Sequence, residues 1–167
     1  MQAKEQSLTF IGNEGKISIP FFQRGYVWDV KNWEELISEL FNMKQNHFLG
    51  SLIMKQQVPL SGQPKEVLVI DGQQRLTTLS ILIKSLYDLF SEEMKKNAQS
   101  AINQYLFFKK NPTDPNYEIK LNHSHIDSQA FQKVIKSNDL HQEKNLNCIT
   151  KESNKILQCY KYFITHL

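Results

Sequence analysis

Residues 67–79 read Val-Leu-Val-Ile-Asp-Gly-Gln-Gln-Arg-Leu-Thr-Thr-Leu, and this stretch decides the expected fold. Val67–Ile70 is a short, continuous apolar run rich in β-branched residues, which predicts a buried strand. The strand ends at Asp71-Gly72, and a helical pattern of apolar residues follows over about 76–95. A buried strand is therefore expected to lead, through a glycine turn, into a long central helix.

The junction between this strand and this helix has the composition of an anion-binding site. The first N–H groups of a helix have no intrahelical partners, and with the helix dipole they favour a negative charge. Gly72 allows a positive φ and close approach of the backbone, and Arg75 can bind phosphate oxygens in a bidentate manner. Further donors, acceptors and hydroxyls come from Gln73, Gln74 and Thr77 or Thr78.

Asp71 is expected at the carboxyl end of the strand, where it is the natural partner of Mg²⁺ or of a catalytic water. A second interpretation needs no ligand: Asp71 caps the helix, Gly72 turns the chain and Arg75 pairs with a surface acid. The stretch is not a Walker A motif, because the chain contains no Gly-x-x-x-x-Gly-Lys-Ser/Thr. The residues of the junction leave both interpretations open.

Arginine is rare in this chain, which makes its positions informative. Lysine and arginine total 20 residues, yet only Arg24 and Arg75 are arginines. The planar, permanently charged guanidinium is suited to carboxylates and phosphates, so the alternatives are a shared anion pocket and two structural salt bridges. Pro20 and Gly25 bracket a rigid loop from which Gln23 and Arg24 are expected to reach the pocket of Arg75.

Aromatic residues, histidines and cysteines give weaker signals. Tyr26 and Trp28 either stack on a base or anchor their loop in the core. His123-Ser124-His125 lacks a third ligand for zinc, and His47 is a better candidate for a pocket. Cys148 and Cys159 are expected to be reduced, buried thiols.

The rest of the chain predicts a single α+β domain with a real core. A net charge of +3 permits contact with a polyanion without arguing for one. Absence of a signal peptide and of a long apolar run predicts a cytoplasmic protein. Further elements are expected as strands at 7–11 and 16–19 around a turn at 12–15, a helix from the N-cap Asp29 to about Lys44, a strand at 48–54, a loop at 59–64, a helix near 98–108, an extended segment at 117–121, a short helix capped by Asp127, and a closing helix through 156–164.

Three strings taken together closely resemble the N-terminal domain of the GmrSD type IV restriction enzyme family, in the ParB/sulfiredoxin-like superfamily. They are Ile19-Pro20 followed by Gln23-Arg24-x-Tyr26-x-Trp28, then His47-Phe48-Leu49-Gly50-Ser51, and then Asp71-Gly72-Gln73-Gln74-Arg75-Leu76-Thr77-Thr78-Leu79. The resemblance implies a ParB/sulfiredoxin-like α+β fold, with a small mixed sheet, packed helices and a C-terminal helical extension. It divides the chain into a domain at 1–95 and an extension at 96–167. Because the chain stops in mid-pattern at Leu167, we expect it to be cut from a longer protein.

The resemblance also implies nucleotide binding, often with hydrolysis, coupled to restriction of modified phage DNA. By motif match, residues 71–75 carry over as the nucleotide and phosphate box, and Gln23 and Arg24 as its companions. A separate C-terminal domain, frequently an HNH nuclease, cuts the DNA in full-length relatives.

We therefore expect a nucleotide-binding regulatory domain of a restriction protein, which either hydrolyses the NTP or only binds it, with DNA reached through the full-length protein. Asp71 would position Mg²⁺ or water as a catalytic group, Arg75 would hold the phosphates with Thr77 nearby, and Arg24 would stabilise added charge. The alternatives are a ParB-like nuclease that nicks DNA, and a non-enzymatic DNA-binding or assembly module. The nucleotide and the oligomeric state are not fixed by the sequence.

Overall fold

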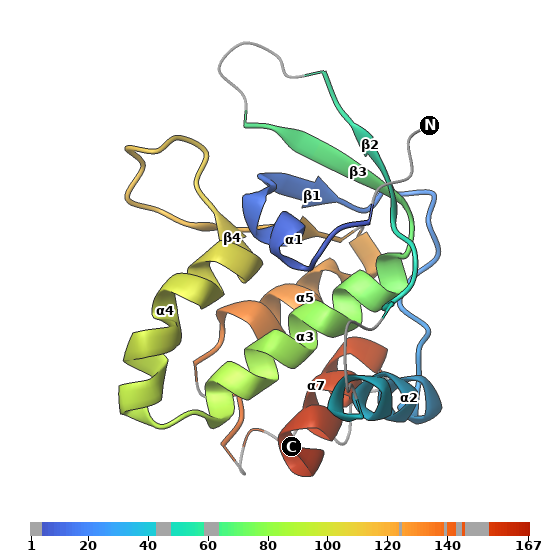
Figure 1. Ribbon diagram of the computed structural model, residues 1–167, viewed down its shortest axis with the longest axis vertical. Coiled ribbons are helices and arrows are strands. Elements are labelled where there is room, and N and C mark those ends of the chain that lie inside the picture. Colours follow the sequence, from blue (N-terminus) through green and yellow to red (C-terminus); the bar gives the residue numbers. More distant parts are fainter. Residues whose placement is uncertain are drawn as a thin grey trace.

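The computed structural model describes residues 5–42, 48–58, 64–123, 125–138, 140–142, 145 and 154–167. A sheet lies at one end of the molecule and a layer of helices lies below it (Figure 1). The helices are α1 (Thr9–Asn13), α2 (Val30–Phe41), α3 (Gln73–Leu89), α4 (Glu92–Leu106), α5 (His125–Lys136) and α7 (Lys155–His166). The strands are β1 (Lys16–Ser18), β2 (Ile53–Gln56), β3 (Glu66–Asp71), β4 (Phe107–Phe108), β5 (Glu118–Ile119) and β6 (Leu121–Asn122).

The main sheet is small and mixed, with the strand order β2-β3-β1-β6. β1 runs parallel to both β3 and β6, whereas β2 runs antiparallel to β3. β4 and β5 form a separate two-stranded antiparallel sheet. The predicted α+β class is confirmed. The predicted boundary between a domain at 1–95 and an extension at 96–167 stays a prediction. β6, from the second part, pairs with β1, from the first part, in the same sheet.

The junction of β3 and α3 has the predicted form, with one correction. β3 covers the predicted strand, and Val67 and Val69 face the core. Gly72 is the N-cap of α3, and its φ of +89° confirms the predicted positive φ. However, α3 begins at Gln73 and not at Leu76. The motif after Gly72 is therefore the first turn of the helix rather than a loop before it.

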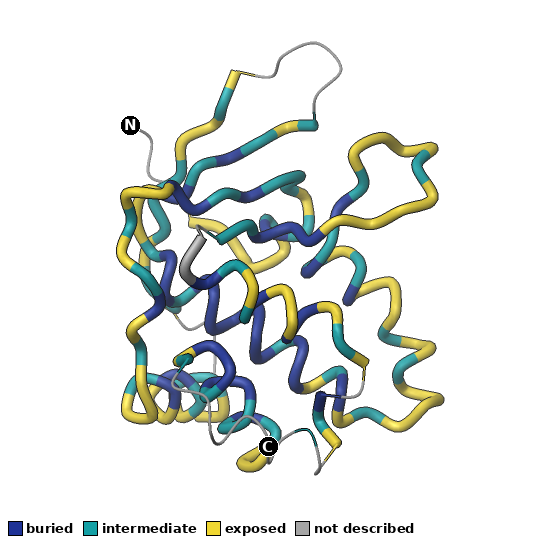
Figure 2. The backbone as a smooth tube through the Cα atoms, turned by 180° about the vertical axis from the view of Figure 1, so that it is seen from behind, coloured by how far each residue is buried: buried dark blue, intermediate teal, exposed yellow. Residues whose placement is uncertain are grey.

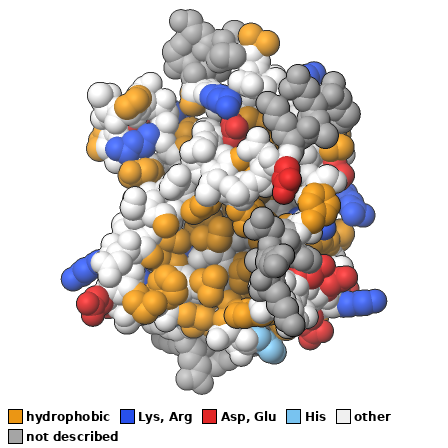
Figure 3. Space-filling view, viewed as in Figure 1, with side chains coloured by type: hydrophobic (Ala, Val, Ile, Leu, Met, Phe, Trp, Pro, Cys, Tyr) orange, Lys and Arg blue, Asp and Glu red, His pale blue; other side chains and the backbone are white. Residues whose placement is uncertain are grey.

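Helix α3 is the centre of the molecule, as its wide apolar face predicted. Dark blue, buried segments concentrate in the central helices when the molecule is seen from behind (Figure 2). The side chains that fill the core around α3 come from several elements and include Trp33, Phe131, Tyr160 and Phe163. Figure 3 shows hydrophobic side chains gathered over the middle of one face, below the sheet.

The predicted strand at 7–11 is wrong, because this segment contains the short helix α1. Ile11 is buried, and the amine of Lys120 donates hydrogen bonds to the carbonyls of Ile11 and Gly12 at 2.9 and 3.0 Å. This amine caps the free carbonyls of a helical turn. β1 then pairs with β3 and β6, so the expected hairpin around 12–15 is not formed.

Two predicted boundaries are also corrected. The helix expected over 76–95 ends at Leu89, and α4 begins after Ser91, whose hydroxyl accepts a hydrogen bond from the Met94 N–H at 3.3 Å. The strand expected at 48–54 begins only at Ile53, since Gly50 has φ of +98° and cannot continue a strand.

The helix predicted after Asp29 is confirmed, and Asp29 forms a capping box with Asn32. Asp127 lies in the first turn of α5 rather than at its N-cap. The predictions for His47, Cys148 and residues 59–63 fall outside the described residues, whereas Cys159 is a buried free thiol as expected. None of the described helices is long and apolar enough to cross a membrane.

Candidate functional site

Three segments that are distant in the sequence meet at the N-terminus of α3. They are the loop at 20–28, the segment at 48–52 and the junction at 71–75, hereafter the DGQQR box. Figure 1 shows them on the right-hand side, where β3 leads into α3. The site is therefore assembled from every one of the three strings that carried the resemblance.

The glutamines of the box bind the backbone of the loop. Gln73 Nε2 donates to the Arg24 carbonyl and Gln74 Nε2 donates to the Gly25 carbonyl, each at 3.0 Å. Gln74 Oε1 accepts from the Val27 N–H at 2.8 Å. Both glutamines are 8% exposed, so these bonds satisfy polar groups that water cannot reach. The two side chains hold the loop against the first turn of α3.

Two further bonds fix the loop from other elements. Gln23 Nε2 donates to the Ile70 carbonyl at 3.0 Å, at the end of β3. The buried carboxylate of Asp127, on α5, accepts from the Tyr26 N–H at 2.7 Å. Burial raises the pKa of Asp127, and the bond from Tyr26 opposes that rise. Gln23 thus lies beside the box, as predicted.

Arg75 is half-buried and lies against Gly50. A Cβ atom added to Gly50 would be 2.4 Å from Arg75 Nη1, so only glycine leaves room for this guanidinium. The Arg75 Cζ atom is 5.8 Å from the centre of the Trp28 ring, a cation–π distance. The string at 47–51 was noted in the sequence, but the role of its glycine in seating Arg75 was not predicted.

Neither arginine forms a salt bridge with any residue that the structure describes. Arg24 is exposed, and its backbone carbonyl is bound to Gln73. The interpretation of both arginines as structural ion pairs therefore finds no acidic partner within the described ranges. The prediction that both guanidinium groups face one cleft stays a prediction.

The start of α3 leaves hydrogen-bonding groups open. The first three N–H groups, of Gln73, Gln74 and Arg75, donate no hydrogen bond to the described part of the chain, and no side chain caps the helix. Gln73 Oε1 is buried and has no partner there either. Segment 50–52 packs on Gly72, where an added Cβ would be 2.3 Å from Leu52 Cδ2. The first turn of α3 therefore carries both open N–H donors and a buried acceptor without a partner among the described residues.

Tyr26 anchors the loop in the core. Its ring is 6% exposed, and its hydroxyl contacts Thr78 Oγ1 at 2.7 Å and accepts from Trp33 Nε1 at 2.8 Å. It also donates to Cys159 Sγ at 3.4 Å, and burial is the main cause that raises the Tyr26 pKa. These contacts favour the anchoring interpretation of Tyr26 and leave base stacking to the half-buried Trp28.

Thr77 is also engaged inside the protein. Its hydroxyl donates to the Gln73 carbonyl at 2.8 Å and lies 3.2 Å from His123 Nε2. Burial lowers the pKa of His123 to about 4. The Thr77 hydroxyl, itself 1% exposed, thus joins the box to a neutral histidine and is not open to a ligand in this conformation.

Asp71 is exposed at the end of β3. No group of three or more histidine, cysteine, aspartate or glutamate residues that could hold a metal ion occurs among the described residues. Asp71 can supply one carboxylate ligand to Mg²⁺, which commonly takes its other ligands from water and substrate phosphates.

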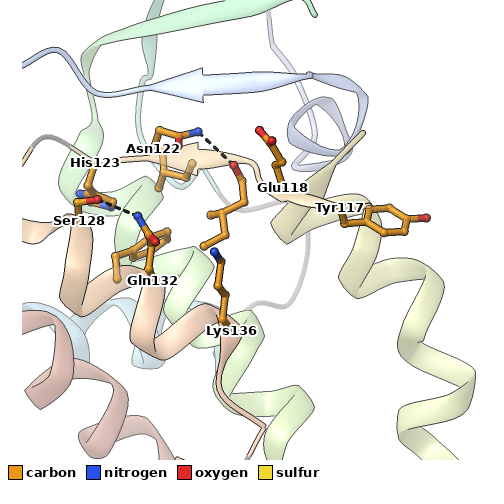
Figure 4. Close-up of a pocket in the computed structure, with 10 residues that line it drawn as sticks. Tyr117, Glu118, Asn122, His123, Ser128, Gln132 and Lys136 are labelled. Carbon is orange, nitrogen blue, oxygen red and sulfur yellow. Dashed lines mark hydrogen bonds between the residues drawn. The ribbon is translucent and has the colours of Figure 1, made fainter. Parts of the chain in front are cut away.

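A separate polar hollow of about 200 Å³ lies between the β5–β6 segment and α5. Figure 4 shows Ser128, Gln132 and Lys136 along α5, near Asn122 and His123. His123 lines this hollow and also contacts Thr77, so this histidine joins the hollow to the helix that carries the box. No residue of the box lines the hollow itself.

Comparison with known proteins identifies the family of the chain. The family model described as "GmrSD restriction endonuclease, N-terminal domain" matches residues 7–167. An uncharacterized protein of Methanocaldococcus jannaschii, MJ0686, is 32% identical over 91 residues, covering 43% of this chain and 15% of the relative. The chain thus spans a small part of that relative's length. The suspected resemblance is confirmed, and the chain belongs to the family of the GmrSD restriction endonuclease N-terminal domain.

Proposed function

We propose that this chain is a nucleotide-binding regulatory domain of a DNA-restriction protein, and that the DGQQR box holds the phosphates. One observation carries the proposal. Arg75 is seated by Gly50 at the open N-terminus of α3, with no carboxylate partner in the described part of the chain. A guanidinium beside free helix N–H groups is the arrangement that binds phosphate in many proteins.

The phosphate ligands are assigned as follows. The N–H groups of Gln73, Gln74 and Arg75 would bind an anion on the helix axis, since they precede the first intrahelical hydrogen bond and have no partner in the described part of the chain. The Arg75 guanidinium supplies two parallel donors to phosphate oxygens. Gln73 Oε1, a buried acceptor without a partner among the described residues, would accept a hydrogen bond from a hydroxyl or amino group of the same ligand.

The loop is already ordered for this role. Gln23, Gln73 and Gln74 fix its backbone through the bonds described above, so little ordering remains when a ligand binds. Arg24 projects from the same loop and would meet the outer phosphates. Trp28, beside Arg75, is the ring that would stack on the base.

Hydrolysis would need Asp71. It is the acid of the box, and it would hold Mg²⁺ together with phosphate oxygens and waters, or orient the attacking water. Positioning and electrostatic stabilisation are the main demands of phosphoryl transfer. DNA cleavage by the complete protein is assigned to a separate nuclease domain.

Titration of the four ribonucleoside triphosphates, with Mg²⁺, into wild type, Arg75→Ala and Arg24→Ala tests the proposal. We expect binding of at least one triphosphate, and a loss of about tenfold or more in Arg75→Ala, because a charge-assisted hydrogen bond contributes about 1.5–3 kcal/mol. Asp71→Asn should retain nucleotide binding and lose hydrolysis. No binding by wild type, or equal binding by Arg75→Ala, would refute the proposal.

A matched control uses a cation that is not part of the box. Lys110 is exposed and pairs with Glu118 on the β4–β5 ribbon. Lys110→Ala removes the same charge and should leave triphosphate affinity unchanged. Equal losses in Lys110→Ala and Arg75→Ala would mean that net charge, and not the box, attracts the nucleotide.

A further inference from the structure

Two phenylalanines occupy the tip of the turn that enters the loop at 20–28. Phe21 is 85% exposed and Phe22 is 69% exposed. The Gln23 N–H donates to the Pro20 carbonyl at 3.1 Å, so the two phenylalanines are the central residues of a tight turn. Glycine, asparagine, aspartate and serine are the usual residues there, and large aromatic residues are usually buried. Neither the turn nor the core accounts for these rings.

The turn is held from both sides. Before it, the Ile19 N–H donates to the Asn122 carbonyl at 2.9 Å, which ties the chain to β6. After it, Gln23 Nε2 donates to the Ile70 carbonyl and the Arg24 carbonyl accepts from Gln73. Because its backbone is fixed, the turn presents the rings with little conformational entropy left to lose on binding.

The two rings project as one unit. Their centres are 5.6 Å apart and their planes meet at 79°, an edge-to-face contact. Neither ring belongs to the hydrophobic core or to the side chains packed against it. The nearest charged residue in sequence is Arg24, which is exposed and forms no ion pair with the described residues.

Apolar side chains next to an arginine are the means by which several architectural proteins open a base step. The rings enter between base pairs and unstack them, while the neighbouring cation binds the adjacent phosphate. We propose that Phe21 and Phe22 form a wedge that inserts into duplex DNA, with Arg24 on the flanking phosphate. The proposal rests on the proposed role in DNA restriction, and it does not require that the box binds nucleotide.

The position of Arg24 places the proposed DNA wedge beside the DGQQR box. Its carbonyl is bound to Gln73 in the first turn of α3, so DNA at the wedge would lie next to a nucleotide at the box. DNA and nucleotide would then compete for the Arg24 guanidinium, so each would weaken the binding of the other by the same factor.

A short duplex carrying 2-aminopurine, whose fluorescence rises when it is unstacked, tests the wedge. Wild type should bind the duplex at low salt and raise the fluorescence. The double variant Phe21→Ala/Phe22→Ala should lose the rise and bind about tenfold more weakly, since stacking against a base contributes about 1–3 kcal/mol. Phe41→Ala is the matched control, because Phe41 is 72% exposed on α2, away from the turn, and should behave as wild type.

Three results would overturn the proposal. They are no fluorescence rise with wild type, an unchanged rise with the double variant, or a double variant that alters only the oligomeric state in light scattering. The last result would make the turn a protein interface. The unfolding midpoint of the double variant should match wild type, because both rings are exposed.

The same preparations separate this proposal from the proposed function. Arg75→Ala should lose triphosphate binding and retain the fluorescence rise, whereas the double phenylalanine variant should do the reverse. If wild type raises the fluorescence but binds no triphosphate, nucleotide binding fails and the wedge stands. If it binds triphosphate but does not unstack the duplex, the wedge fails and the nucleotide site stands.

Discussion

The two halves of α3 differ in how their charged side chains are paired. In its second half, Lys84 and Asp88 form an ion pair whose side chains are 4% and 2% exposed. Lys84 Nζ also donates to the Ser137 carbonyl at 2.8 Å, and the Tyr160 hydroxyl donates to Asp88 at 2.7 Å. In its first turn, Arg75 lies against a glycine and an aromatic ring and forms no ion pair with a described residue.

This difference separates structural charges from functional ones. Burial lowers the pKa of Lys84, and the bond and charge of Asp88 oppose that change. A buried pair that is also bonded to α5 and α7 stabilises the packing of three helices. A guanidinium that is held in place by shape, beside open N–H groups, has its bonding capacity free for a ligand.

Breaking the buried pair should have the largest effect on stability. Asp88→Ala leaves the Lys84 amine buried beside the Ser137 carbonyl and removes the carboxylate that accepts from the Tyr160 hydroxyl. We expect the free energy of unfolding to fall by about 3–5 kcal/mol, measured by urea denaturation. Triphosphate binding to the fraction that remains folded should be retained.

The control for Asp88→Ala is an exposed ion pair on the next helix. Lys95 Nζ and Glu92 Oε1 are 3.1 Å apart, and the Glu92 side chain is 86% exposed. Glu92→Ala should cost less than about 1 kcal/mol. If Asp88→Ala cost no more than Glu92→Ala, the assignment of a structural role to the buried pair would be wrong.

Gly50→Ala should have an intermediate effect on stability and a specific effect on the box. The new Cβ would lie 2.4 Å from Arg75 Nη1, at a φ of +98° that disfavours alanine. We expect a loss of about 1–3 kcal/mol in unfolding experiments, and weaker triphosphate binding because Arg75 must move. Gly12→Ala, whose Cβ would lie 2.7 Å from Gln104 Nε2 and meets no residue of the box, should leave triphosphate binding unchanged.

His123 should give a smaller, pH-dependent effect near the box. Its pKa is lowered from 6.5 to about 4 in the folded protein, so between these values the unfolded chain binds a proton that the folded chain does not. Stability should therefore decrease as the pH falls from 6.5 towards 4, with a slope of at most about 1.4 kcal/mol per pH unit from this group. His123→Gln should flatten the dependence of the free energy of unfolding on pH in this range. An unchanged dependence would mean that the His123 imidazole is exposed to solvent and not buried.

The sequence predicted the local features of the site well. The buried strand, the positive φ of Gly72 and the cap of α2 at Asp29 were all correct. Each depends on a few neighbouring residues whose backbone preferences are strong. The family resemblance was also correct, because it rested on three separate strings.

Contacts between distant segments were not predictable in this way. The bonds from Gln73 and Gln74 to the loop join residues 49 positions apart, and no local pattern encodes them. Lys84 and Asp88 have the spacing of an ordinary exposed helix pair, so their burial is hidden in the sequence. The segment at 7–11 was predicted as a strand, because a run this short does not distinguish a strand from a helical turn. It contains α1 instead, and the Lys120 amine binds the Ile11 carbonyl of that turn.

Amide chemical shifts test the contrast between the two halves of α3 most directly. In ¹⁵N–¹H spectra, a triphosphate with Mg²⁺ should shift the N–H signals of Gln73, Gln74 and Arg75, together with those of Arg24 and Gly50. The signals of Lys84 and Asp88 should stay in place. At a triphosphate concentration that just saturates wild type, Arg75→Ala should strongly reduce the shifts. Shifts confined to the second half of α3 or to the hollow beside α5, or no shifts at all, would contradict the assignment of the DGQQR box as the anion site.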